Sequence, residues 1–405
     1  MKPILHIVNN KIHNRTHNLL GSVKDIKTRI EYFRHRKLKT CTIVPKGNFF
    51  SVRKKLRHLN KENFSKVLVE QSQSVLLQVY LFFKFRKVIY RSHNAEIYHR
   101  FHIFKYNLVF FFSNILFKDI KFSIKKVIYI FYTTFFFFPI NILKYFFRDL
   151  CISILAESVI AVSKWEKNNY WRYFPFVKKY YADFFLSSFY IKKIKNSKLN
   201  KKNIIIISGS YHPNPISYEQ IRSIYILLSL KRRSKLFKKF KFIVTGKVSK
   251  GILHFLIKKK VHHIKNVYFY YDKKSLIADK ELKIYEKSFG KYPWNRFKII
   301  SSDDFGNYYQ LLKIAKAMMF CTDAGFGVKT KAWEAYAHGC FLLMNEKLFE
   351  KFPRDFDLIN YKYNNDDLDI ILKKLMNYNF PQNNLNRFLK KSAYATYDKA
   401  FGYKK

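Results

Sequence analysis

The hydrophobic positions form short apolar runs that alternate with longer stretches of helical spacing. Pro3 to Val8 reads as a first buried strand, residues 19–36 have helical spacing with a basic face, and Thr40 to Pro45 reads as a second buried strand. This strand–helix–strand order predicts the opening of a doubly wound sheet. The same half of the chain continues with predicted strands at Val88 to Tyr90 and Glu157 to Ser163, and with a helix that begins near Lys164.

A second α/β half follows the lysine- and asparagine-rich stretch Lys192 to Asn203, which we interpret as a linker. Ile204 to Ile207 predicts a strand covered on both faces, because only such a strand carries a continuous apolar run. Lys241 to Gly246 and Ala317 to Cys321 predict further strands, and Asp366 to Lys405 reads as helices. Strands and helices that alternate in both halves predict two Rossmann-like α/β domains with parallel sheets.

One segment departs from this alternation. Phe101 to Phe147 is dense in Phe, Tyr and Ile with interspersed lysines, and its most apolar part is Val127 to Leu143. That part falls short of the ~20 residues that a spanning helix needs, and Pro139 interrupts it. Two interpretations stay open. The segment is either an interfacial helix or hairpin, with aromatic rings at the acyl boundary and lysines at the headgroups, or it forms core helices of the first domain.

The net charge of the chain predicts a class of binding partner. The chain has 78 Lys+Arg against 27 Asp+Glu, a net charge of +51. Such an excess attracts polyanions: nucleic acid, anionic lipid headgroups or a charged glycan. AT-rich coding explains many lysines but not the scarcity of glutamate, so we expect an anionic membrane surface as a partner. No helix-turn-helix, RNP or zinc signature predicts specific binding of nucleic acid.

The cysteines and the amino-terminal run bear on the compartment. Cys41, Cys151, Cys321 and Cys340 are widely spaced and form no CxxC pair, which predicts neither a zinc ribbon nor a disulfide framework and suits a reducing cytoplasm. The amino-terminal run lacks a small-residue cleavage site and reads as a strand rather than a signal peptide. We expect a cytoplasmic protein that uses no metal and no cofactor.

The strongest chemical signal follows the predicted strand that ends at Cys321. It reads Asp323-Ala-Gly-Phe-Gly-Val-Lys-Thr-Lys-Ala-Trp-Glu-Ala-Tyr-Ala-His-Gly339. Gly325 and Gly327 let the backbone approach a ligand closely, and a helix amino terminus there offers amide groups to phosphate oxygens. Lys329 adds a positive charge. A carboxylate at Glu334 can accept hydrogen bonds from two ribose hydroxyls.

This run resembles the nucleotide-sugar-binding motif of the retaining family 4 glycosyltransferases, in the branch that reads G-x-G-x-K-x-K-x-x-E-A-x-A-x-G. Three other stretches agree with the family in order. Ser92 to Glu96 (SHNAE) is similar to its H-N-x-E turn, Ile160 to Ser163 to its V-I-x-V-S strand, and Ser208 to Asn214 (SGSYHPN) to its G-S-x-x-x-P-N loop. The chain departs from the family at Phe326, where many members have a glutamate, and in the glycine-free stretch after the first strand.

The resemblance implies two Rossmann-like domains that face each other across a cleft, the GT-B type of fold. It places an acceptor-binding domain at residues 1–195, with an aromatic and basic helical insertion at about 101–148. A domain that binds the nucleotide sugar is expected at 204–375. The helices of residues 376–405 are expected to cross back to the first domain.

The resemblance also implies an activity: transfer of a sugar, with retention, from a nucleoside diphosphate to a lipid-linked or polysaccharide acceptor at the inner face of the cell membrane. His93 would contact the sugar or the phosphate, Lys329 would neutralise the departing diphosphate, and Glu334 would bind the ribose. The implied substrate contacts are Asn94, Glu96, Gly209, Ser210, Asn214, Gly246, Gly325, Phe326, Gly327, Val328, Thr330 and Lys331.

Each of these residues also has an ordinary structural interpretation. His93 and Asn94 could form a hydrogen-bonded turn at a strand end, Glu334 could be a solvated helix residue, and Lys331 could be surface charge. Two other functions stay open for the whole chain. One is a nucleotide-binding pseudoenzyme or membrane scaffold without turnover, and the other is a basic protein that binds nucleic acid.

Overall fold

The chain divides into two compact units. The first comprises mainly residues 1–193 and 383–405, and the second mainly residues 194–323 and 331–382. The computed structural model describes residues 2–8, 21–46, 48–71, 73–85, 87–117, 128–129, 131–188, 191, 201–208, 224, 235–245, 248, 267–269, 305–321, 330–344, 348, 358–360, 365–378 and 385–403.

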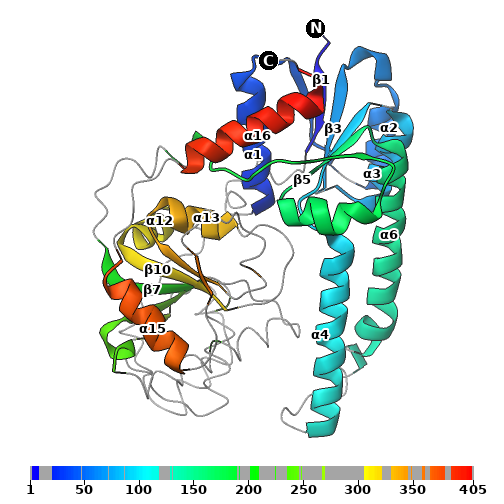
Figure 1. The fold of residues 1–405 in the computed structure, drawn as a ribbon. Helices are drawn as coiled ribbons and strands as arrows, with labels where there is room; N and C mark the ends of the chain where they lie inside the picture. The colour runs from blue at the N-terminus through cyan, green and yellow to red at the C-terminus, as the bar shows by residue number, and fades with distance from the viewer. Residues whose placement is uncertain are drawn as a thin grey trace. The chain divides into compact units, whose positions relative to one another are not determined.

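A six-stranded parallel sheet of order β2-β1-β3-β4-β5-β6 forms the centre of the first unit (Figure 1). From β1 the chain goes to β2 on one side and then returns to place β3 on the other side. The point where the strand order reverses therefore lies between β1 and β3. The strands are β1 (Ile4–Ile7), β2 (Thr40–Ile43), β3 (Lys66–Glu70), β4 (Val88–Arg91), β5 (Ser158–Ala161) and β6 (Lys178–Tyr181).

The second predicted strand is present, but the prediction that it is buried was wrong. In β2, Thr40 and Thr42 are exposed, and Cys41 and Ile43 are only half-buried. β2 is the edge strand of its sheet, so it has a single neighbour, β1, and carries alternating polar and apolar residues. The apolar run of the sequence did not reveal this edge position.

Three helices connect the first four strands: α1 (Gly21–His35), α2 (Phe49–Arg57) and α3 (Val75–Lys84). Polar side chains begin two of them, because Asn48 accepts a hydrogen bond from the amide of Ser51 and Ser74 accepts one from the amide of Leu77. Short turns of 3-10 helix occur at Lys61–Asn63 and Trp171–Tyr173, and a π-helical turn at Glu166–Tyr170. The core between sheet and helices is apolar, with Leu5, Leu81 and Trp171 among its buried members.

The predicted helical insertion lies between β4 and β5. Its described residues include α4 (Glu96–Phe117), a π-helical turn (Thr133–Phe137) and α6 (Phe138–Leu155). α4 and α6 pack side by side, and α3 packs against α6 (Figure 1). A search of the described residues finds no helix with the length and apolar character needed to cross a membrane.

The carboxyl-terminal helix α16 (Leu385–Phe401) belongs to the first unit and packs on α1. Tyr32 Oη donates a hydrogen bond to Asp398 at 2.9 Å, and Arg36 forms an ion pair with the same carboxylate. The rings of Tyr32 and Tyr397 are 5.0 Å apart. Buried aromatic contact and a shared carboxylate thus attach the last helix to the first sheet's helical layer.

The second unit has a six-stranded parallel sheet of order β12-β11-β10-β7-β8-β9, the order of dinucleotide-binding Rossmann sheets. Ile204 to Ile207 are buried as predicted. Two parallel sheets with helical connections confirm the predicted α/β fold class. The strands are β7 (Lys202–Ser208), β8 (Lys241–Thr245), β9 (Val267–Phe269), β10 (Ala315–Phe320), β11 (Phe341–Met344) and β12 (Leu358–Asn360), and the helices are α12 (Phe305–Ile314), α13 (Thr330–Ala337) and α15 (Asn365–Met376), with a 3-10 turn at Phe237–Lys239.

Candidate functional site

The topology of the second sheet places the motif segments together. Open parallel sheets bind ligands outside the carboxyl ends of their strands, where the strand order reverses. In this sheet β7, β8 and β9 run outward to one side and β10, β11 and β12 to the other, so the reversal lies between β7 and β10. Ser208 is the last residue of β7 and begins the SGSYHPN stretch, and the glycine-containing motif follows β10. Both motif segments therefore start at the strand pair of the switch point.

One side-chain contact joins the two motif segments. Lys331, the second residue of α13, donates a hydrogen bond from Nζ to Ser208 Oγ at 3.0 Å. Thr330, the first residue of that helix, is half-buried. The ammonium group of Lys331 thus lies at the carboxyl end of β7, near the amino-terminal end of a helix, where an anionic ligand would meet favourable charge from both.

Glu334 lies on the buried side of α13. Its side chain is fully buried, and its Oε1 accepts a hydrogen bond from Tyr309 Oη at 2.5 Å. Tyr309 belongs to α12, so this contact ties the motif helix to the helix that precedes β10. Glu334 is therefore not a solvated helix residue.

The end of the same helix is fixed by His338 and Gly339. His338 Nδ1 faces the Glu334 carbonyl oxygen at 2.6 Å, and because a carbonyl can only accept, Nδ1 carries the proton. The ring stacks on Tyr309 with centroids 5.1 Å apart, and burial lowers the pKa of His338 to about 4. Gly339 has φ +74°, a left-handed conformation that ends the helix without a steric cost.

A half-buried lysine, Lys201, supports this arrangement from the other side. Lys201 Nζ donates to the carbonyl oxygens of Ala315 at 2.7 Å and His338 at 2.6 Å. Burial lowers the pKa of Lys201, while its contact with Cys340 acts in the opposite direction. The lysine therefore joins β7, β10 and the end of α13, and it fixes the strand pair from which the motif segments start.

In the first unit a cluster of charged side chains lies at the carboxyl ends of β1, β3 and β4. His93, just beyond β4, faces two carboxylates: its Nδ1 is 3.3 Å from Asp25 Oδ2 and its Nε2 is 2.8 Å from Glu70 Oε2. Arg29 pairs with Asp25 at 2.9 Å and with Glu70 at 2.5 Å. Arg91 pairs with Asp25 at 3.1 Å.

Burial determines the electrostatics of this cluster. Asp25, Arg29, Glu70 and Arg91 have almost no exposed side-chain surface, whereas 13% of His93 is exposed. Burial alone would raise the pKa of Asp25, but Arg29 and Arg91 outweigh it and lower that pKa well below its usual range. Burial opposes ionisation of Glu70 too, and Arg29 again prevails and lowers the pKa. The negative charges of two carboxylates and the positive charges of two guanidinium groups cancel. The imidazole of His93 is the part of the cluster that reaches the surface.

His6 completes the cluster from β1. Its Nε2 is 2.8 Å from Glu70 Oε1, and burial lowers the pKa of His6. Glu70 thus accepts hydrogen bonds from a neutral histidine on one oxygen and faces His93 with the other. This fixes the orientation of the carboxylate that positions the His93 ring.

The backbone of the SHNAE turn is fixed by Gln71. Gln71 Oε1 accepts hydrogen bonds from the amides of His93 and Asn94, the latter at 2.7 Å, and Gln71 Nε2 donates to the Asn94 carbonyl at 2.8 Å. Ser92 donates to buried Glu166, whose pKa is raised by burial. His93 and Asn94 do form a hydrogen-bonded turn, and that turn presents the His93 ring to two acids.

Glu96 begins α4 and faces a second buried group of charges. Its Oε2 is 3.6 Å from Arg100 Nε, and burial raises its pKa while Arg148 lowers it. Arg148 pairs with Asp149 at 2.6 Å. The predicted residues Lys329, Gly209, Ser210, Asn214, Gly246, Gly325, Phe326, Gly327 and Val328 lie outside the described residues.

Sequence reasoning missed the buried partners of His93. Asp25 and Arg29 lie on a helix that was predicted only as basic and amphipathic, and Glu70 ends β3, which was not predicted at all. The apolar run Val67–Leu68–Val69 that ends in an acid could have indicated a strand with a charge at its carboxyl end. No pattern in the sequence connects such distant positions.

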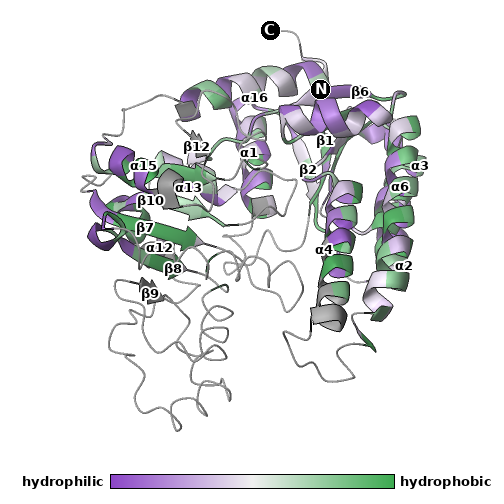
Figure 2. Cartoon of the chain, turned by 60° about the horizontal axis from the view of Figure 1, so that its bottom comes forward, coloured by the Kyte–Doolittle hydropathy of each residue, from purple (hydrophilic) through white to green (hydrophobic). Residues whose placement is uncertain are grey.

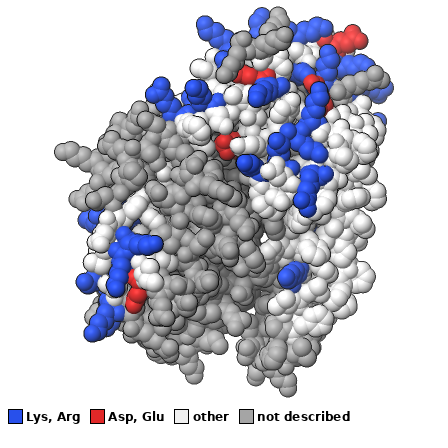
Figure 3. Space-filling view, viewed as in Figure 1, with Lys and Arg blue, Asp and Glu red and all other residues white. Residues whose placement is uncertain are grey.

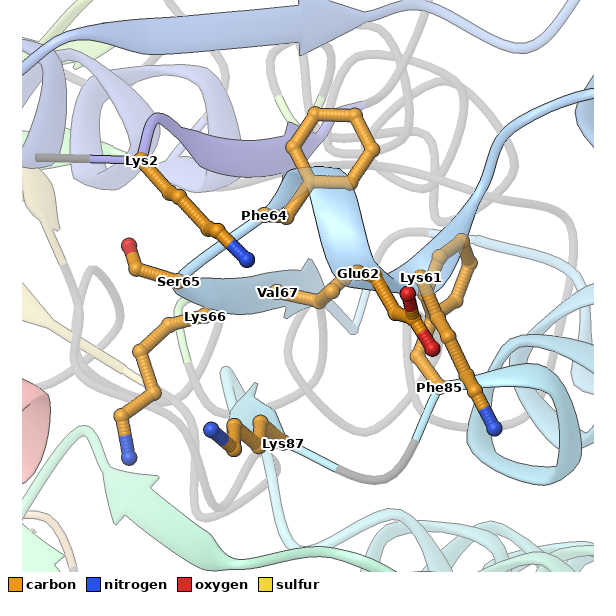
Figure 4. Close-up of a pocket in the computed structure, with 9 residues that line it drawn as sticks. All are labelled: Lys2, Lys61, Glu62, Phe64, Ser65, Lys66, Val67, Phe85 and Lys87. Atoms are coloured by element: carbon orange, nitrogen blue, oxygen red, sulfur yellow. The ribbon is translucent and has the colours of Figure 1, made fainter.

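A hollow in the first unit lies away from this site. It has a volume of about 520 Å³ and is lined by Lys2, Lys66, Lys87 and neighbouring residues (Figure 4). It lies at the amino-terminal ends of β3 and β4, whereas His93 follows the carboxyl-terminal end of β4. Within the part of the chain that the structure describes, no group of His, Cys, Asp or Glu is arranged to bind a metal ion.

No family model and no curated protein matches the sequence. Among solved structures, the chain is similar to HepE from Anabaena in complex with UDP-glucose, at 11% identity over 99% of this chain and 96% of that chain, with a TM-score of 0.47. It is also similar to a UDP-forming α,α-trehalose-phosphate synthase from Burkholderia xenovorans (8% identity, 99% and 96% covered, TM-score 0.46). A protein from Listeria monocytogenes described as a putative UDP-N-acetylglucosamine 2-epimerase is 8% identical, with 97% of this chain and 91% of that chain covered and a TM-score of 0.48.

Proposed function

We propose that the protein is a glycosyltransferase of the GT-B type that moves a hexose-type sugar from a nucleoside diphosphate to a hydroxyl group of a lipid-linked or polysaccharide acceptor. The observation that carries the proposal is the contact of Lys331 with Ser208 at the β7–β10 switch point. It brings together two stretches that resemble the donor-binding motif of one family, at the edge where a Rossmann sheet binds nucleotides.

In this proposal, α13 and the segment before it bind the nucleotide-sugar donor through charge and hydrogen bonds. Lys331, with Lys329 and the amides of the glycine-containing segment, would stabilise the negative charge that grows on the β-phosphate as the sugar leaves. Glu334 would bind the ribose. Positive charge from lysines and helix amides takes the place of a metal ion, and the reaction needs no cofactor.

The reaction exchanges one carbon–oxygen bond for another. The bond between the anomeric carbon and the β-phosphate oxygen breaks through an oxocarbenium-like state, and the acceptor oxygen bonds to the same face of that carbon, which gives retention. The hydroxyl proton of the acceptor passes to the departing diphosphate, so no protein base is needed. The family resemblance implies that His93, which Asp25 and Glu70 orient, would contact the transferred sugar or its phosphate.

The acceptor side of the proposal places the protein in the cytoplasm, peripherally on the inner face of the cell membrane. The net charge of +51 supports attraction to anionic headgroups. The charge is spread along the chain rather than gathered in a nucleic-acid-binding motif, which argues against a specific nucleic-acid partner.

Turnover tests the proposal. Purified protein would be incubated with a panel of nucleotide sugars and a mixture of lipid-linked and polysaccharide acceptors, and release of nucleoside diphosphate and labelled glycan would be followed. We expect activity with one donor, a loss of about 10²-fold or more in kcat for Lys331→Met, and little change for the matched variant Lys373→Met on exposed α15. A folded protein that binds a nucleotide without turnover would instead identify a pseudoenzyme.

A further inference from the structure

Helix α6 has its apolar and polar faces reversed relative to a helix packed in water. Four of its apolar residues are exposed: Ile140 (63% exposed), Leu143 (57%), Phe147 (60%) and Ile154 (61%). They recur at steps of three, four and seven positions, so they form one stripe along the helix. In water such a stripe normally faces the protein core.

The buried side of the same helix is partly polar. Arg148, Asp149 and Ser153 are buried, and Tyr170 donates a hydrogen bond to Asp149. The same reversal continues into the preceding π-helical turn, where Thr134 is buried while Phe136 is 53% exposed. The Arg148–Asp149 pair therefore lies inward, and apolar side chains of the helix lie outward, as in an element whose outer surroundings are apolar.

The neighbouring helix α3 also has exposed apolar residues. α3 packs against α6, and two of its residues seven positions apart, Leu76 (62%) and Phe83 (68%), are exposed. Coloured by hydropathy, the ribbons of α3 and α6 are largely green (Figure 2). We call this surface the apolar face and define it by Leu76, Phe83, Ile140, Leu143, Phe147 and Ile154. Several large exposed apolar side chains on two helices that pack together mark an interaction site.

Charge identifies the partner. The part of the first unit over α4 and α6 is mostly white in Figure 3, whereas blue Lys and Arg side chains gather over the rest of the unit toward its sheet. Lys105 and Lys144 are exposed on the two helices themselves. Apolar side chains bordered by cations fit an anionic lipid monolayer, which offers acyl chains below a negative surface.

We propose that the apolar face is the surface by which the protein binds a lipid bilayer, with α6 and α3 lying in the interface plane and the bordering lysines at anionic headgroups. The short apolar stripe and the buried Arg148–Asp149 pair on the inner side of α6 are the features of an element that lies on the bilayer surface. This inference deepens the proposed function, since it names the surface that would bring a lipid-linked acceptor to the first unit, and it rests on that proposal only for the acceptor.

Vesicle flotation tests the inference, with the full chain and vesicles of phosphatidylcholine with or without phosphatidylglycerol. We expect the protein to float with the anionic vesicles and less with the neutral ones. The double variant Leu143→Ser/Phe147→Ser should lose binding about tenfold or more, because each change removes a large apolar side chain from the acyl boundary. The control Ile370→Ser/Phe388→Ser alters residues of similar exposure (54% and 61%) outside the apolar face and should float like the wild type.

Other outcomes overturn the inference. These are failure of the folded wild type to float with anionic vesicles, equal loss of binding in both double variants, and a wild-type dimer that the Leu143→Ser/Phe147→Ser change converts to a monomer without vesicle binding. The last result would assign the face to a second copy of the chain. Circular dichroism melts check that each variant is folded. A nucleotide-binding assay on the same samples separates the two proposals, because protein that binds nucleotide but not vesicles contradicts only the membrane surface.

Discussion

At the scale of single residues, the first unit is organised by buried charges that cancel. Asp25 and Glu70 remain ionised in the protein interior because Arg29 and Arg91 contact them, and His93 uses both carboxylates as its support. Removing one member of such a set leaves buried charges that no longer balance, which costs more than the set contributes as a whole.

Glu70→Gln is therefore expected to destabilise the protein by about 3 kcal/mol, because Arg29 loses one of its two buried carboxylate partners. Urea unfolding measures the change, and Glu62→Gln, on an exposed turn, serves as the control with a change near zero. Equal and small effects of the two variants would show that the cluster does not contribute to stability.

The same lowered pKa values determine how stability depends on pH. Asp25 and Glu70 titrate lower in the folded chain than in the unfolded chain, so their contribution is complete above the ordinary carboxyl pKa of about 4 and is lost as the pH falls below it. We expect the free energy of unfolding of the wild type to fall as the pH is lowered below about 4, and that of Glu70→Gln to fall less steeply. If the free energies of unfolding of the wild type and of Glu70→Gln depended on pH in the same way, this explanation would be contradicted.

His338 gives a separate acid dependence in the second unit. Its pKa is about 4 when folded and 6.5 when unfolded, so its contribution is complete above pH 6.5 and is lost as the pH falls toward 4. The difference corresponds to about 3 kcal/mol. His338→Gln, which cannot titrate, is expected to flatten the stability of the second unit between pH 6.5 and 4, as measured by thermal melts across that range. An unchanged slope would mean that His338 is protonated in the folded protein.

At the scale of elements, sequence patterns predicted the strands whose own residues show that they are buried. The isoleucine run Ile204 to Ile207 is a central strand because both faces of β7 are covered, and its neighbours β8 and β10 confirm that position. β2 shows the limit of such reasoning, since an edge position depends on which strands pair and not on the strand's own residues. β3 was missed because its run is short and ends in charged residues.

The end of α13 offers a test at this scale. Gly339→Ala is expected to cost about 1 kcal/mol, because alanine is strained at a φ of +74°. Gly339→Asn should cost less, since asparagine tolerates the left-handed region better than other residues with a side chain. Chemical denaturation of the second unit measures both, and a smaller cost for Ala than for Asn would contradict the conformational explanation.

At the scale of the whole molecule, the sequence predicted the two α/β halves and located part of each candidate site. Motif order placed His93 after a strand of the first sheet and Lys331 and Glu334 on the helix after β10. The partners that orient them were not predictable, because Glu70 reaches His93, and Ser208 reaches Lys331, only through contacts between distant parts of the chain. The reversed polarity of α6 likewise became visible only when burial was known for each residue.

Donor binding tests the central proposal most directly. Thermal unfolding of the wild type, Lys331→Met and Lys373→Met would be followed with a panel of nucleoside diphosphates and nucleotide sugars. We expect one nucleotide to stabilise the wild type and Lys373→Met, by about 2–3 kcal/mol at a ligand concentration a hundredfold above its dissociation constant, and to stabilise Lys331→Met much less. Stabilisation of none of the folded proteins by any nucleotide, or equal stabilisation of all three, would contradict a donor site at the β7–β10 switch point.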